Sequence, residues 1–201
     1  MRYLTCWALP LTLALLAGCS QVVVPEALAK NLRTVQGELD LGKTNIINTT
    51  AAVKNLRDNR GADLKPQYTA FTDALTALEN KVGGMQVVGA VSREKAASFF
   101  QDWEKQISQI ADQNVAQSTD DRRKATLEAY DNLKAKIQKL REAYQPYYAS
   151  LTDVRTAMNV DMTQQGATAA RPAMDNAIRQ SKEVIDRLDD VNDAINKMLG
   201  S

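Results

Sequence analysis

The chain has 201 residues, enough for one domain with a substantial core. It contains no histidine and only two cysteines, which leaves few ways to build a nucleophilic catalytic dyad or a transition-metal site. Its 25 lysines and arginines balance 24 aspartates and glutamates, so it lacks the basic surface typical of nucleic-acid-binding proteins. Residues that favour helices, such as alanine, leucine, lysine and glutamine, dominate the composition and predict an all-α protein.

The first segment, residues 1–18, has the layout of a secretory signal peptide. Arg2 supplies a positive charge, an apolar stretch runs from Tyr3 to Leu16, and small residues follow. The apolar stretch has about 14 residues, whereas a membrane-spanning helix needs roughly 20. A buried helix of a globular domain is the alternative, but a wholly apolar segment at the N-terminus disfavours it. We expect residues 1–18 to be cleaved off.

The residues around the expected cleavage point, Leu16-Ala17-Gly18-Cys19, resemble the bacterial lipobox. The resemblance implies that a signal peptidase recognises Leu16, Ala17 and Gly18. It also implies that Cys19 becomes the first residue of the mature chain and carries a diacylglycerol and a fatty acid such as palmitate. Two or more acyl chains anchor a protein stably to a membrane. Ser20, where an aspartate would signal inner-membrane retention, favours an outer-membrane lipoprotein of the bacterial cell envelope that faces the periplasm.

Apolar residues after the tether, residues 19–25, recur at alternating steps of four and three. This 3.5-residue repeat is typical of helices that pack through a narrow seam, and it predicts a single helical periplasmic domain over residues 26–201. Gly42 lies on the first seam and would permit a close approach of a second helix. The seam residues are Leu28, Leu32, Val35, Leu39, Gly42, Ile46, Thr49, Val53 and Leu56.

A second helix is predicted to begin near Asp63, after a break at Gly61, so that it pairs with the first as an antiparallel hairpin. Its seam residues are Leu64, Tyr68, Phe71, Leu75, Leu78, Val82 and Met85. The glycine-rich stretch 82–91 then forms either a buried turn, which we favour, or an exposed apolar tip. Ser92 is predicted to cap a further helix. Its aromatic residues, Phe99, Phe100 and Trp103, indicate a bundle core more than a binding patch.

A long helix is predicted from Ser118 or Thr119 to about residue 163, kinked at Pro146. Its seam residues are Tyr130, Leu133, Ile137, Leu140, Tyr144, Tyr147, Leu151, Val154 and Met158. Pro172 is predicted to open the final helix, with seam residues Met174, Ile178, Ser181, Ile185, Leu188, Asn192, Ile195 and Leu199. Together these segments predict an elongated antiparallel helical bundle, or coiled-coil hairpins, of four to five helices without a sheet.

Candidate chemical sites are few. Adjacent carboxylates, as in Asp120-Asp121 and Asp189-Asp190, point about 100° apart on a helix and do not form an acid–base dyad. We therefore expect no enzyme, no catalytic residue, no metal and no cofactor. Three tyrosines beside Pro146 could stack on a sugar: Tyr144, Tyr147 and Tyr148. The alternative, which we favour, is that Tyr144 and Tyr147 bury their rings on the seam and leave only Tyr148 free.

Three stretches, together with the lipobox, resemble a family of proteobacterial lipoproteins of unknown function with a long helical or coiled-coil periplasmic region: FFQDWEKQISQIAD, YQPYYASLTDVRTAMN and IDRLDDVNDAINKM. The expected function is a non-enzymatic interaction or spacer element in the periplasm. Its partners would be the membrane, through the lipid on Cys19, and an unidentified protein or a second copy, with no nucleic acid. The alternative is a binding module for an envelope ligand such as peptidoglycan or lipid.

Overall fold

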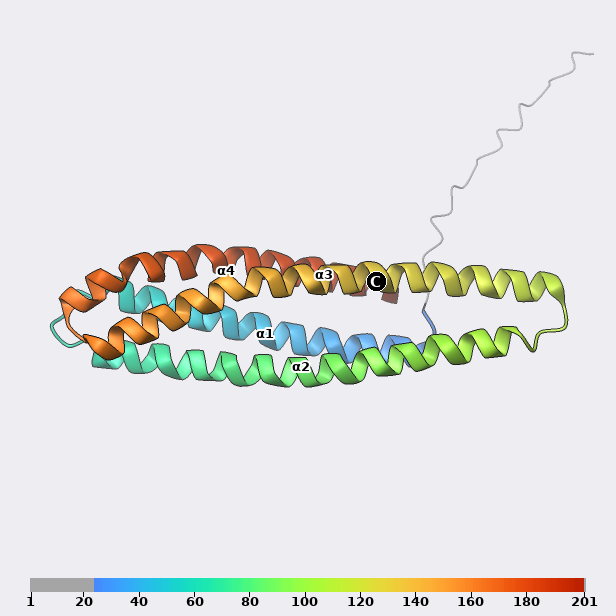
Figure 1. Ribbon diagram of the computed structural model, residues 1–201, viewed down its shortest axis with the longest axis horizontal. Coiled ribbons are helices and arrows are strands. Elements are labelled where there is room, and N and C mark those ends of the chain that lie inside the picture. The colour runs from blue at the N-terminus through green and yellow to red at the C-terminus, as the bar shows by residue number, and fades with distance from the viewer. Residues whose placement is uncertain (1–23, 201) are drawn as a thin grey trace, which may run out of the picture.

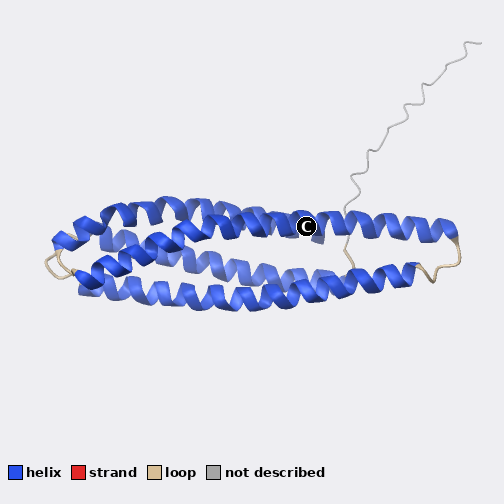
Figure 2. Cartoon of the chain, in the orientation of Figure 1, coloured by secondary structure: helices blue, strands red, loops and turns tan. Residues whose placement is uncertain are grey.

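The computed structural model describes residues 24–200, which form four α-helices and no strand (Figures 1 and 2). The expected all-α class is thereby confirmed. Leu16, Ala17, Gly18 and Cys19 lie outside the described residues. The helices are α1 (Glu26–Asp58), α2 (Lys65–Ile107), α3 (Gln113–Val160) and α4 (Gln164–Leu199).

The four helices form an antiparallel bundle in which each helix lies beside two others (Figure 1). Helix α1 packs against α2 and α4, and α3 packs against α4 and α2, so that α1 and α3 face each other across a diagonal. The contact between α2 and α3 is the least extensive of the four. This arrangement is the up-down-up-down bundle that short connections between long helices favour.

Helices α2 and α3 are longer than their neighbours and project beyond the bundle as a two-helix hairpin (Figure 1). At the root of this projection the rings of Phe100 and Tyr130 lie 5.7 Å apart. We call residues 101–129 the overhang. It lies at the same end of the bundle as the start of α1, and on α3 it extends about 25 Å beyond Tyr130 at 1.5 Å per residue.

The bundle core follows the predicted seams with informative exceptions. On α1 every predicted seam residue is buried apart from Val35, which is partly buried. On α4 half of the seam is displaced by one residue, because α4 turns its face toward both α1 and α3. The buried residues there include Ala177, Val184, Val191 and Met198, and Ile178, Ile185 and Leu199 pack against the core from its side. Within residues 24–200 the buried apolar residues, from Val24 to Met198, form one continuous core cluster.

The glycine-rich stretch 82–91 is neither a turn nor a tip, contrary to both alternatives, because α2 continues through it and through Ser92. None of its glycines has a positive φ, so each adopts a conformation that a helix accepts. Packing outweighs the propensity cost of about 1 kcal/mol per glycine. Met85 lies against α1 at Gly42, where an added Cβ would approach its Sδ to 2.8 Å, so Gly42 does permit the expected close approach.

The predicted starts of the last two helices are wrong by several residues. Helix α3 begins at Gln113, before Ser118 and Thr119, because the Asp112 carboxylate accepts hydrogen bonds from two amides of the first turn. Helix α4 begins at Gln164, where the Thr163 hydroxyl accepts a hydrogen bond from the amide of Gly166. Pro172 therefore lies inside α4 and does not open it.

Polar pairs fix the alignment of α1 against α4. From one pair to the next, the residue number on α1 increases by the same amount as the residue number on α4 decreases, as expected of two antiparallel helices. The pairs are Gln36–Asn196 (2.8 Å), Asp40–Asn192 (3.0 Å), Lys43–Asp189 (2.5 Å) and Arg57–Asp175 (3.0 Å).

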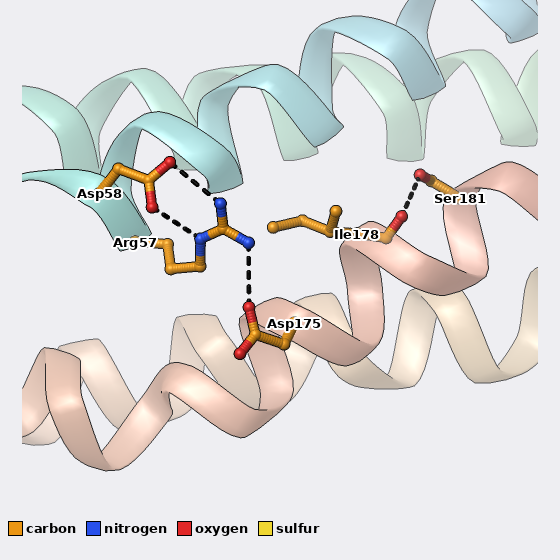
Figure 3. A network of polar contacts seen from close by, with 5 residues as sticks. All are labelled: Arg57, Asp58, Asp175, Ile178 and Ser181. Carbon is orange, nitrogen blue, oxygen red and sulfur yellow. Dashed lines mark hydrogen bonds and ion pairs between the residues drawn. The ribbon is translucent and has the colours of Figure 1, made fainter.

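The last of these pairs belongs to a small network (Figure 3). Two guanidinium nitrogens of Arg57 donate hydrogen bonds to the two carboxylate oxygens of Asp58, at 2.8 and 3.0 Å. The third nitrogen donates to Asp175 at 3.0 Å. The hydrogen bonds from Arg57 hold the pKa of Asp58 below its usual value. Nearly two turns further along α4 the Ser181 hydroxyl donates to the carbonyl oxygen of Ile178 at 2.8 Å, which satisfies a polar group on the core side.

Candidate functional site

Of the three tyrosines singled out in the sequence, Tyr147 belongs to the core. It lies on α3 and is 0% exposed. Its hydroxyl lies 3.1 Å from that of Thr50 and 3.4 Å from the carbonyl oxygen of Ile46, both on α1. Burial raises the pKa of Tyr147 to about 12. These contacts give Tyr147 a structural role and leave no face for a ligand.

Tyr144 and Tyr148 instead stack on each other at the surface between α2 and α3. Their ring centroids are 5.8 Å apart and their planes are inclined by 17°. The Tyr148 hydroxyl donates to Glu79 of α2 at 2.8 Å, and Glu79 also pairs with Arg155 at 3.0 Å. Tyr148 is thus held in place, whereas the alternative favoured from the sequence leaves it free.

Tyr144 is half-buried, and its hydroxyl makes no hydrogen bond to another residue in the described range 24–200. Burial is the main cause that raises the pKa of Tyr144. Its position explains the free hydroxyl, because Tyr144 lines two adjoining cavities between α2 and α3. Tyr147 is therefore a core residue, Tyr148 is fixed by its hydrogen bond to Glu79, and Tyr144 lines the cavities.

The two cavities form a continuous groove along the α2–α3 face. The smaller has a volume of about 470 Å³ and lies over the tyrosine pair, with Glu79 and Gly83 on its α2 side. The larger has a volume of about 690 Å³, within the range of small-molecule sites. Val82 and Tyr144 line both cavities. We refer to the two together as the α2–α3 groove.

The larger cavity reaches into the bundle and is mostly apolar. All four helices contribute to its lining, so its floor is the bundle core itself. The apolar residues include Leu39 and Ile46 from α1, Met85 and Val88 from α2, Ile137 from α3 and Leu188 from α4. A groove of this kind can hold an apolar molecule or chain by removing its surface from water.

The groove exists where the seam residues are only partly buried. Val82 and Met85 on α2 and Tyr130, Ile137 and Tyr144 on α3 occupy predicted seam positions, yet all remain partly buried against the core. Further along α3, where the bundle is closed, Leu151, Val154 and Met158 are 0% exposed. The groove therefore marks the part of the bundle where α2 and α3 do not complete their contact.

Charged side chains border the larger cavity, and most of them are cationic. Arg93 lines it from α2, and Lys134 and Arg141 line it from α3. The carboxylate that lines the same cavity, Glu38, is paired with Lys81 at 3.1 Å. The border of the groove is thus electropositive although the chain as a whole is nearly neutral.

Residues 24–200 contain no group of three or more histidine, cysteine, aspartate or glutamate side chains that could hold a metal ion. None of the four described helices has a stretch that is apolar and long enough to cross a membrane. The most prominent concave feature of the described region is the apolar α2–α3 groove with cations at its edge.

Comparison with known proteins yields one family. A family model with the description "Protein of unknown function (DUF2959)" matches residues 26–199. The chain belongs to this family. No curated protein and no solved structure matches this DUF2959 chain. The matched range covers all four helices of the bundle, so the whole α2–α3 groove is part of the DUF2959 region.

Sequence reasoning missed the residues that make the groove. The heptad pattern treats Ile137 and Tyr144 like any other seam residue, and it says nothing of Arg93, Lys134 or Arg141. One signal is present in the sequence: the glycines at 83 and 89 remove side chains from α2 beside the groove. Because glycine is a poor helix former, the glycines at 83, 84 and 89 also predict a turn, and from the sequence alone the turn is the simpler interpretation.

Proposed function

We propose that this DUF2959 protein is a non-enzymatic lipoprotein of the bacterial cell envelope, anchored in the outer membrane through Cys19. The observation that carries the proposal is the lipobox Leu16-Ala17-Gly18-Cys19 at the end of a signal-peptide pattern. The helical region would then act in the periplasm as an interaction or spacer element. The scarcity of catalytic groups supports a role in binding or spacing.

The length of the tether gives the proposal a geometric consequence. Residues 20–25 separate Cys19 from the start of α1, and six residues span at most about 22 Å when fully extended. The end of the bundle that carries the overhang would therefore stay close to the membrane. The opposite end, with the connections from α1 to α2 and from α3 to α4, would extend into the periplasm.

The anchoring is tested by metabolic labelling with a palmitate analogue and by globomycin, which blocks lipoprotein signal peptidase. We expect Cys19→Ser to abolish the label, and globomycin to cause an unprocessed precursor to accumulate. The matched control is Cys6→Ser, because Cys6 lies in the segment expected to be removed. Normal labelling of Cys19→Ser, or processing that globomycin does not affect, would overturn the proposal.

A second candidate function, a binding module for an envelope ligand, is favoured by the α2–α3 groove. Its lining suits lipid better than peptidoglycan, because sugars require many hydrogen-bonding groups and the larger cavity is mostly apolar. A pull-down with peptidoglycan compares the unaltered protein with a Tyr144→Ala, Tyr148→Ala variant, leaving the core residue Tyr147 in place. Retention that depends on these two rings would favour glycan, and no retention favours an apolar ligand.

A protein partner or self-association completes the proposed role as an interaction element. Crosslinking in intact cells followed by mass spectrometry identifies either. Crosslinked peptides from two copies of this chain would indicate self-association, and sedimentation of the purified chain from Ser20 onward would then give the stoichiometry. Crosslinks to one other envelope protein would identify the partner.

A further inference from the structure

We propose that the α2–α3 groove binds one long-chain fatty carboxylate, with the chain in the larger cavity and the carboxylate between Arg93 and Lys134. The assignment rests on the second candidate function, the ligand-binding module, and is independent of the lipid anchor at Cys19. It specifies the chemical class of the ligand, its orientation and the residues that hold each end.

The shape of the larger cavity fits a single extended chain. On α3 its lining runs from Tyr130 to Gln145, a distance of about 22 Å along the helix. Its volume of about 690 Å³ is much too small for a helix of a second protein, whose diameter with side chains is about 10–12 Å. A narrow apolar groove of this length favours one linear chain over a folded partner.

The apolar part of the groove supplies the driving force. The lining includes Leu39 and Ile46 from α1, Met85 and Val88 from α2, and Ile137 from α3. A hydrocarbon chain lying on these side chains removes apolar surface from water on both sides of the contact, at about 25 cal/mol per Å². The gain increases with chain length, so a long chain is preferred to a short one.

The cations locate the carboxylate at one end of the groove. Arg93 on α2 makes no ion pair with another of the residues 24–200. The Arg93 guanidinium lies over Gly89, where an added Cβ would be 3.7 Å from its Nη1, an ordinary van der Waals distance. Charge-assisted hydrogen bonds to a carboxylate would satisfy this guanidinium.

Arg93, Lys134 and Tyr130 all line the same cavity. The Lys134 ammonium lies 5.7 Å from the Tyr130 centroid. Burial raises the pKa of Tyr130, and the positive charges of Lys134 and Arg93 oppose this rise, as expected of two cations close to one phenol. Lys134 also pairs with the exposed Asp131 at 2.8 Å, a surface contact that a bound carboxylate can replace at little cost.

The test is photoaffinity labelling of the protein produced from its full sequence. It is purified in digitonin, which has no linear alkyl chain, and is exposed to palmitic acid that carries a diazirine in its chain. After irradiation, mass spectrometry locates the label. We expect it in peptides covering residues 78–93 of α2 and 130–145 of α3. Excess palmitate should remove the label, and hexadecanol, which lacks the carboxylate, should need about tenfold higher concentrations.

Two neighbouring valines provide a matched pair of variants. Val88 lines the cavity, whereas Val87 is 65% exposed and lies outside it. We expect Val88→Trp to fill the groove and weaken labelling at least about tenfold, and Val87→Trp to have no effect. Circular dichroism checks that both variants remain helical.

A second pair tests the charge without altering the core. Arg93→Gln should weaken labelling about tenfold, while Arg122→Gln, an exposed arginine of the overhang outside the cavity, should not. Equal labelling of Arg93→Gln and the unaltered protein, or equal competition by hexadecanol, would overturn the assignment of the carboxylate. Label spread over the outer surface of α1 and α4 would overturn the groove as the site.

The outcomes also separate this assignment from the second candidate function. A protein that retains peptidoglycan through Tyr144 and Tyr148 but is not labelled by palmitate would keep the binding module and overturn the fatty carboxylate. Absence of both signals would overturn the two together.

Discussion

The hydroxyl groups of Tyr147 on α3 and Thr50 on α1 lie 3.1 Å apart and connect the two helices across the diagonal of the bundle. Thr50 also bonds to the carbonyl oxygen of Ile46 at 2.7 Å, so its single proton is already used. The Tyr147 hydroxyl therefore donates to Thr50. The backbones of α1 and α3 do not pack directly against each other. The Tyr147 side chain therefore provides a direct link between two helices that otherwise both pack against α2 and α4.

Removing this hydroxyl should have a modest, measurable cost. We expect Tyr147→Phe to lower the free energy of unfolding by about 1 kcal/mol, because Thr50 keeps its bond to Ile46 and loses only a donor. Tyr147→Ala should cost about 3–5 kcal/mol, since it leaves a large cavity. Urea unfolding of the chain from Ser20 onward measures both. An unchanged midpoint for Tyr147→Phe would show that the diagonal bond does not contribute.

Stability should fall in alkaline solution, and Tyr147 should account for part of the fall. The unfolded phenol loses its proton near pH 10, whereas burial raises the pKa of the folded one to about 12. The stabilisation is complete below pH 10 and is lost as the pH rises toward 12, because the unfolded state then binds fewer protons. A pKa difference of this size corresponds to about 3 kcal/mol.

The comparison of Tyr147→Phe with the unaltered protein isolates this contribution. At pH 8 the variant should be the less stable of the two, and near pH 11.5 the difference should shrink or change sign. Guanidinium unfolding at both pH values provides the measurement. Parallel losses of stability in the two proteins would contradict the assignment to Tyr147.

Two glycines should respond to alanine in opposite directions. Gly166 lies in the first turn of α4, where an added Cβ would collide with the carbonyl oxygen of Asp161 and approach its Cγ to 2.7 Å. Gly166→Ala should therefore destabilise the protein by about 1–3 kcal/mol. Gly84 lies in mid-α2 with no atom within 4 Å of such a Cβ, and Gly84→Ala should stabilise it by about 1 kcal/mol. A loss at Gly84 would indicate that residues 82–91 are not helical.

The overhang should open more easily than the bundle. Its helices each have a single neighbour, and the exposed Val115 near its tip, 53% accessible, has no core to enter. Amides of residues 101–129 should therefore exchange their hydrogens faster than those of residues 68–80, where α2 is packed on two sides. Hydrogen exchange followed by mass spectrometry resolves the two groups. Equal protection would indicate that another molecule covers the overhang.

The heptad pattern predicted the fold class and most of the core, because a 3.5-residue repeat is a direct record of which side a helix buries. It located α1 from Leu28 to Leu56 correctly. Helix ends were less predictable. Asp112 and Thr163 begin helices because their side chains accept hydrogen bonds from first-turn amides, but nothing in the sequence distinguishes them from other polar residues nearby. The continuation of α2 through Gly83 and Gly84 was not predictable either, since it depends on tertiary contacts such as that of Met85 with Gly42.

The candidate site was less predictable than the fold. A seam pattern indicates which residues face a partner helix, but it does not say whether the partner comes close enough to cover them. Tyr144 and Tyr147 are three residues apart on the same seam, and one borders a groove while the other is fully buried. The difference arises from the separation of α2 and α3, which only the three-dimensional arrangement specifies.

The polar pairs between α1 and α4 have a consequence that a stability measurement would miss. Each pair is at least partly exposed to water, so each alone contributes little free energy. A slip of one heptad, however, would separate all of them at once while leaving mostly apolar residues against apolar residues in the core. Their value lies in the cost that they impose on wrong alignments, which the repetitive apolar seams alone would tolerate. Single substitutions at these positions would look neutral, and combined ones would yield a bundle that folds in more than one way.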